Sequence, residues 1–163
     1  MSRQLSDLQS ILSQLTVEHR KLLSQLESQH TAMKKFDITA MGDLLTAQEA
    51  TRMRIIGLET RRKALIRQIT TSLRLSEPPT LSALAGMFPQ QAAGLNKARL
   101  ELREIIARVS QRGSRSGRLA GAVLGHLNTA MRLLAAAVER AGLYTRRGVP
   151  RLASRIGVME AVG

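Results

Sequence analysis

Three histidines are the residues of this chain best suited to metal binding or proton transfer, and their spacing supports neither. His19, His30 and His126 lie far apart, and none has a second histidine four residues away, the spacing that places two imidazoles on one helix face. The chain contains no cysteine, which excludes disulfides and thiolate chemistry. His19 and His126 also fall on the helical seams described below, where a polar residue is tolerated. We therefore expect no metal site and no cofactor.

The acidic residues are few and scattered, so paired carboxylates for acid–base catalysis are not expected. Glu101 and Glu104 stand three residues apart, but arginines 99, 103 and 108 surround them, as in a solvated ion-pair face. The glycines between 113 and 125 follow no predicted strand and therefore give no phosphate-binding loop. These patterns predict a protein that is not an enzyme.

The strongest charge signal is the basic stretch RVSQRGSRSGR, residues 108–118. The formal net charge is +13, and residues 99–163 hold 12 arginines against 4 acidic residues. Arg108, Arg112, Arg115 and Arg118 could neutralise phosphates, but no aromatic residue lies nearby to stack on a base. A solvated arginine face is the alternative that we favour, and we do not expect nucleic acid to be the partner.

Tyr144 is the only tyrosine, and Phe36 and Phe88 are the only other aromatic residues. It lies in AGLYTRRGVP, residues 141–150, directly after a long helical pattern. Two interpretations stay open: the ring closes the end of the helix packing, or it is a docking residue.

Three seams of apolar residues at alternating spacings of three and four must position these groups. The first runs from Leu5 to Phe36 and the second from Met41 to Ile69, with Asp37 or Asp43 as the cap between them. The third runs from Leu95 to Tyr144. This pattern predicts an all-α fold: an antiparallel helical hairpin or coiled coil, a long third helix and a flexible C-terminal tail.

The expected helix boundaries follow from the positions of prolines, glycines and capping residues. We predict helices over about 3–36, 38–75 and 92–146, a Pro-rich linker over 76–91 and a flexible basic tail over 147–163. Residues 1–146 would form a single helical domain. A short helical turn over 80–87, capped by Thr80, is expected inside the linker. The glycines at 113, 117, 121 and 125 indicate either a weak helix with a bend or break near 112–118 or a flat groove for another helix.

Neither a membrane anchor nor a secretion signal is expected. The most apolar window, 119–138, contains His126, Asn128 and Arg132, and an arginine near a bilayer centre is costly. The N-terminal MSRQLSDLQS lacks an apolar signal core.

The order of these features resembles the FlgN-like family of flagellar export chaperones, from about Leu5 to Gly148. Four elements carry the resemblance: the Leu/Gln-rich opening helix, the segment 37–66, the loop PTLSALAGMFP over 79–89, and the last helix ending in a tyrosine and a glycine. The matching residues of the second element are Gln48, Glu49, Leu58, Glu59 and Arg61 or Arg62; those of the fourth are Tyr144 and Gly148. The family's N-x-x-N-x-x-L pattern is represented by Gly113, Ser116 and Leu119, without either amide.

The resemblance implies a cytoplasmic, non-enzymatic chaperone of type III flagellar export. It would bind the C-terminal helical region of hook-associated proteins, prevent their premature assembly and deliver them to the export gate, with the export ATPase complex as a further partner. The docking role at the gate would fall to Tyr144.

A stripe on the third helix is the expected binding surface for these proteins. Its members are apolar and small enough to permit close approach: Leu119, Val123, Leu127, Ala130, Leu134 and Ala137. The alternative is that this stripe packs on the first two helices. Three other classes of protein stay open: a basic coiled coil associated with nucleic acid, the coiled-coil stalk of the export ATPase, and a structural coiled-coil oligomer.

Overall fold

A computed structural model describes residues 2–140 and shows an all-α protein, as the sequence predicts. The elements in chain order are α1 (Ser2–Lys35), α2 (Ile38–Ser72), α3 (Leu81–Met87) and α4 (Pro89–Arg140). The chain divides into two compact units, Met1–Leu119 and Ala120–Gly163. The predicted tail over 147–163 and the predicted helix end at 146 lie outside the described residues.

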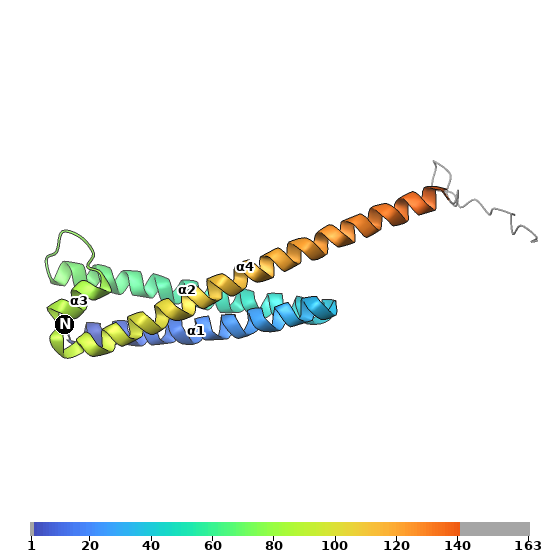
Figure 1. Ribbon diagram of the computed structural model, residues 1–163. Coiled ribbons are helices and arrows are strands. Elements are labelled where there is room, and N and C mark those ends of the chain that lie inside the picture. Colours follow the sequence, from blue (N-terminus) through green and yellow to red (C-terminus); the bar gives the residue numbers. More distant parts are fainter. Residues whose placement is uncertain (1, 141–163) are drawn as a thin grey trace, which may run out of the picture. The chain divides into compact units, whose positions relative to one another are not determined.

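Helices α1 and α2 form an antiparallel hairpin and lie side by side along their length (Figure 1). The first seam is the reason: Leu5, Leu8, Leu12 and Leu15 are almost fully buried. Burying a leucine side chain contributes roughly 1.5–3 kcal/mol, so these four residues alone are a major part of the driving force for pairing.

The turn between α1 and α2 is closed by two local motifs. Phe36 adopts a left-handed φ of 55°, and the amides of Phe36 and Asp37 donate to the carbonyls of Met33 and Ala32, which is a Schellman motif. Asp37 then caps α2 by accepting from the Ala40 amide at 3.0 Å. The predicted cap is therefore Asp37, whereas Phe36, predicted to lie on the seam, points into solvent with 66% of its side chain exposed.

A second Schellman motif ends α2 at Ser72, three residues earlier than expected. Arg74 has a φ of 55°, and the amides of Arg74 and Leu75 donate to the carbonyls of Thr71 and Thr70. A non-glycine residue in this conformation carries strain, which the two hydrogen bonds offset.

The segment over 76–91 is more ordered than the expected linker. Thr80 accepts from the Ala83 amide at 3.1 Å and caps α3, so the short helix expected over 80–87 is present. Leu84 and Ala85 are buried in the main core. Helix α4 begins at Pro89 rather than near 92, because proline is well suited to the first helical position, where its missing N–H is not needed.

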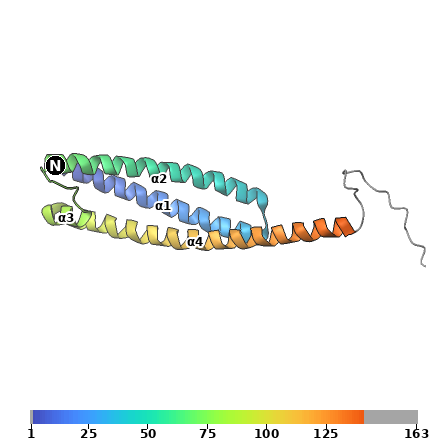
Figure 2. The same ribbon diagram turned by 90° about the horizontal axis from the view of Figure 1, so that it is seen from above.

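The first part of α4 packs on the hairpin through Leu95, Ala98, Leu102 and Ile105, which share one core with α1 and α2. Figure 2 shows this part of α4 running alongside α1, with α2 on the other side of α1. The approach is close at Gly94, where an added Cβ would lie 2.7 Å from the Gln9 side chain. Arg20 of α1 and Glu101 of α4 also pair at 3.6 Å.

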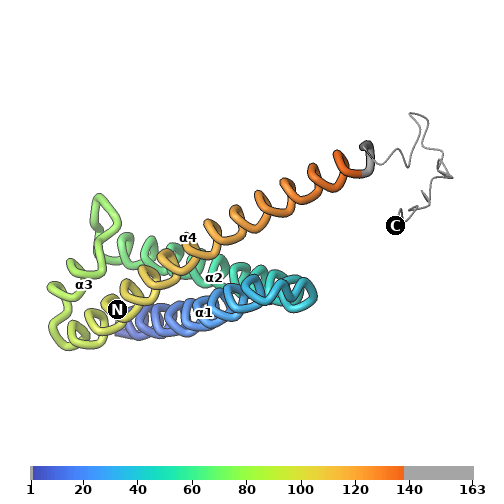
Figure 3. The backbone as a smooth tube through the Cα atoms, turned by 45° about the vertical axis from the view of Figure 1, so that its right-hand side comes forward, coloured from blue at the N-terminus to red at the C-terminus, as the bar shows by residue number. Residues whose placement is uncertain are grey.

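Helix α4 continues without a break through the four glycines (Figure 3). The break that the sequence allowed near 112–118 is therefore absent. A Cβ added at Gly113, Gly117, Gly121 or Gly125 would meet nothing within 4 Å, so none of these glycines is required by packing inside the described chain.

Candidate partner-binding face on α4

The second part of α4 exposes the apolar residues that the sequence singled out. Leu119 and Val123 are half-buried, while Leu127 is 52% and Leu134 is 63% exposed. Ala130 and Ala137 are exposed. Leu127, Ala130, Leu134 and Ala137 all belong to the unit Ala120–Gly163, and each of them is exposed.

Two further residues, Leu124 and Met131, belong to the same face, although the sequence pattern did not lead us to predict them. Leu124 and Met131 are 66% and 67% exposed. On a helix of 3.6 residues per turn, they lie beside Leu127 and Leu134, three and four residues away. We define the α4 apolar face by its six central members: Val123, Leu124, Leu127, Ala130, Met131 and Leu134.

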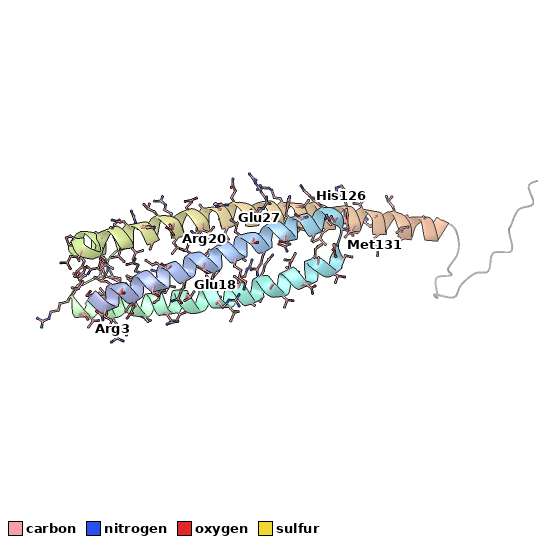
Figure 4. The ribbon with its side chains drawn as sticks, turned by 90° about the horizontal axis from the view of Figure 1, so that it is seen from below. Arg3, Glu18, Arg20, Glu27, His126 and Met131 are labelled. Atoms are coloured by element: carbon pink, nitrogen blue, oxygen red, sulfur yellow. The ribbon has the colours of Figure 1, made fainter. Side chains whose placement is uncertain are left out.

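The sequence prediction did not include Leu124 and Met131 because it assumed a repeat of seven residues. The heptad repeat drifts by about 20° per heptad relative to a straight helix. A repeat of seven residues counted from Leu95 therefore places His126 and Leu133 on the predicted stripe. In a straight helix these two residues lie on a different side from Leu124 and Met131, and both are exposed. Counting with the helical period of 3.6 would have found Leu124 and Met131. Figure 4 labels His126 and Met131 on this part of α4.

The buried side of α4 and the α4 apolar face are one continuous stripe in the helical period. Leu95, Ala98, Leu102 and Ile105 occupy its first part, and burial continues to Ser116, which is 5% exposed. From Leu124 onward the large apolar residues of the stripe are more than half exposed. Exposed contiguous apolar surface of this kind is typical of an interaction site.

The candidate groups for chemistry are engaged in structure or stand apart. His19 Nδ1 lies 2.8 Å from the Leu15 carbonyl oxygen, one turn earlier on α1. Glu101 pairs with Arg20 rather than with its neighbouring arginines. Within residues 2–140, no group of three potential metal-ligating His, Asp or Glu side chains gathers in one place.

The hollows on the hairpin are open grooves between α1 and α2. One of them is lined by residues such as Ser10, Val17, Arg54 and Gly57. Arg54 is already paired with Glu18 at 2.9 Å, and Figure 4 shows Glu18 and Arg20 on α1.

A polar layer crosses the hairpin near its closed end and accounts for part of the sequence pattern. Gln48 is 4% exposed and donates to Gln29 Oε1 at 3.1 Å. Thr51, 0% exposed, donates to the Ala47 carbonyl and accepts from Arg54. Glu59 and Arg62 pair within α2, and Leu58 lies in the core. The Gln48–Gln29 hydrogen bond joins α2 to α1, whereas the bonds of Thr51 and Glu59 are made within α2.

A long amphipathic helix, buried by a helical hairpin at one end and apolar and exposed at the other, is the arrangement expected of a protein that holds another helix. The family model described as FlgN protein matches residues 1–151. The chain belongs to the FlgN family. No curated protein and no solved structure matches it.

The FlgN family consists of flagellar export chaperones rather than enzymes, and its members bind flagellar hook-associated proteins. This FlgN protein has, in the part of the chain described, no helix with the length and apolar character needed to cross a membrane. Tyr144, the predicted docking residue, lies outside the described residues.

Proposed function

We propose that this FlgN-family chaperone binds the C-terminal helical region of hook-associated proteins on the α4 apolar face. The observation that carries the proposal is the change along one stripe of α4, from leucines that the hairpin buries to leucines that nothing in the described chain covers. An amphipathic helix of the partner would pack its apolar side against these exposed leucines.

The α4 apolar face supplies part of the binding free energy that a chaperone needs. Complete burial of one leucine or methionine contributes roughly 1.5–3 kcal/mol, and four such residues on the face are more than half exposed. Association itself costs about 4–15 kcal/mol, which is of the same size, so a partner must make contacts beyond these four side chains to reach a micromolar dissociation constant, about −8 kcal/mol. A chaperone must later release its cargo, so moderate affinity suits the function.

The proposed consequence is that the cargo helix is covered before export. Covering it in the cytoplasm prevents premature assembly, and the loaded chaperone then delivers it to the export gate, where the export ATPase complex is a further proposed partner. We assign docking at the gate to Tyr144, as the resemblance implies.

Co-purification tests the binding mode. A tagged chaperone is mixed with a hook-associated protein, either intact or lacking its C-terminal helix. The proposal expects recovery of the intact protein only. Equal recovery of both forms contradicts the binding mode, and recovery of neither contradicts the function. Light scattering of the free chaperone provides the control, because a stable dimer that buries the face would make it an oligomerisation surface.

A further inference from the structure

A pocket of about 440 Å³ opens between α2 and the connection that leads from α2 to α3, and the proposed function does not use it. We call it the α2 basic pocket. From α2 it is lined by Arg62, Lys63, Ile66 and Arg67, and from the connection chiefly by Pro78 and Pro79. These residues belong to the unit Met1–Leu119, so the pocket shares no residue with the α4 apolar face.

Both ends of the connection are fixed by hydrogen bonds, and Figure 1 shows it rising from the end of α2 and returning to α3. The Schellman motif at Arg74 ends α2, and Thr80 caps α3 by accepting from the Ala83 amide. Between them the rings of Pro78 and Pro79 each lock one φ angle. A partner therefore meets a wall that is already formed, and binding loses little conformational entropy on this side.

The apolar part of the pocket is the edge of the main core. Ile66 is 8% exposed and belongs to that core, and Leu81, which also lines the pocket, packs against it half-buried. The two prolines add apolar surface without an N–H donor. An apolar side chain that enters the pocket would therefore extend the core and be removed from water.

The charges at the pocket are basic and accessible. Lys63 and Arg67 are exposed and lie four residues apart on one side of α2. Neither takes part in an ion pair found among residues 2–140, whereas Arg62 pairs with Glu59. Glu77 precedes Pro78 but does not line the pocket. Like charges one turn apart on a helix repel each other, and an anion placed between them would relieve that repulsion.

Other hollows of the described chain have a different charge balance. Three of them each include an acid among their lining residues: Glu18, Asp7 and Glu101. The α2 basic pocket is lined by three basic residues and no acidic one. An apolar interior beside basic side chains is complementary to a ligand that is itself both apolar and anionic.

We propose that the α2 basic pocket binds a short acidic segment of a partner protein other than the cargo helix. A large apolar side chain of this segment packs on Ile66 and Leu81, and a neighbouring carboxylate binds Lys63 and Arg67. The two carboxylate oxygens match the donor fork of the Arg67 guanidinium. The inference goes beyond the proposed function and does not depend on it.

The dimensions favour a short extended segment over a long helix. From Arg62 to Arg67 the axis of α2 advances by about 7.5 Å, which is the length of about two residues of extended chain. Nucleic acid is a poorer match, because a sugar–phosphate backbone would leave the apolar interior empty and no aromatic residue lines the pocket to stack on a base.

The test uses three short labelled peptides in a glycine–serine background. The first contains two adjacent glutamates followed by leucine and phenylalanine. The second has glutamines in place of the glutamates, and the third has alanines in place of the leucine and phenylalanine. Their affinities for the full-length chaperone are measured by fluorescence anisotropy at about 20 mM salt, where charges are weakly screened.

We expect the first peptide to bind about tenfold more tightly than either of the others. Its advantage over the glutamine peptide should vanish in the K63Q/R67Q variant. The matched control K21Q/R52Q also removes one lysine and one arginine from exposed positions, outside the pocket, and should keep the advantage. Equal binding of the three peptides to the wild type overturns the inference, as does an equal loss in the control variant.

Methyl NMR spectra locate the bound peptide. The first peptide should shift the signals of Ile66 and Leu81 and leave those of Leu124 and Leu127 on the α4 apolar face unchanged. Shifts confined to the α4 apolar face overturn the inference. A single-stranded oligothymidine that binds more tightly than the first peptide, and loses this affinity in K63Q/R67Q, also overturns it, in favour of nucleic acid.

Failure of the proposed function has a different signature. A wild-type chaperone that recovers no hook-associated protein contradicts the proposed function, whatever the peptides do. K63Q/R67Q should recover the intact hook-associated protein as the wild type does. Loss of this recovery in K63Q/R67Q alone would assign the pocket to the cargo and overturn the inference of a separate partner.

Discussion

Leu95 and Leu124 lie on the same face of α4, about eight helical turns apart, yet Leu95 is 0% exposed and Leu124 is 66% exposed. The same residue type on the same stripe therefore has two roles. The first leucine is part of the chaperone's own core. The second is available to a partner.

This difference predicts two very different effects on stability. Leu95→Ala removes a fully buried side chain and should lower the free energy of unfolding by about 2–5 kcal/mol. Leu124→Ala removes an exposed one and should change it by less than about 0.5 kcal/mol. Urea denaturation followed by circular dichroism measures both, and similar losses in the two variants would show that Leu124 is part of the core.

The glycines of α4 give a second prediction. Gly125 has open space around its Cα, so Gly125→Ala should stabilise the helix by about 0.8–1 kcal/mol. Gly125 lies two residues from both Val123 and Leu127, and residues two apart do not share a face. Cargo affinity should therefore not fall. A gain in helicity accompanied by a clear loss of affinity would instead favour the flat groove that the sequence left open.

The pH dependence of stability gives a third prediction. The pKa of His30 is lower in the folded protein than the ordinary value of 6.5, because of burial and the charges of Lys34, Arg112 and Arg115. Below that ordinary value the unfolded state binds the proton more readily, so the free energy of unfolding should fall as the pH drops from about 7.5 to about 5.5. Above it, His30 is neutral in both states and contributes nothing.

His30→Gln should reduce this slope, and His126→Gln, a change at an exposed position of α4, should leave it unchanged. Thermal melts of the three proteins across this pH range provide the measurement. An unchanged slope in His30→Gln would contradict the effect of burial and of the charges of Lys34, Arg112 and Arg115 on this histidine.

Tyr144 provides a fourth prediction, which concerns export rather than binding. If the ring docks on the export gate, Tyr144→Ala should leave the melting temperature and cargo affinity unchanged while secretion of the hook-associated proteins falls. Secretion assays together with thermal melts separate the two interpretations of this residue. A lowered melting temperature with reduced cargo affinity would assign the ring to the helix packing instead.

Much of the fold could be predicted from local patterns. The leucine seam of α1, the Asp37 cap and the Thr80 cap each depend on neighbours within one or two turns, and all three are present. The boundaries near 72 and 89 were less predictable, because a Schellman motif with Arg74 and a proline at the first helical position are compatible with several nearby endpoints.

The candidate site was only partly predictable. Val123, Leu127 and Leu134 were found from their spacing, but Leu124 and Met131 require the period of a straight helix. The charge of Arg112 acts on His30, about 80 positions earlier in the chain and on another helix. Sequence spacing within one helix could not reveal it.

The central claim is that the α4 apolar face holds the cargo, and isothermal titration with an intact hook-associated protein tests it most directly. The triple variant Leu124→Ser, Leu127→Ser, Met131→Ser should bind at least about 100-fold more weakly than the wild type, since roughly 1 kcal/mol or more is lost at each position. The matched control Val17→Ser, Met53→Ser, Ile56→Ser changes three equally exposed apolar residues of the hairpin and should bind as the wild type does. Unchanged affinity of the α4 variant, or an equal loss in the hairpin variant, would contradict the account.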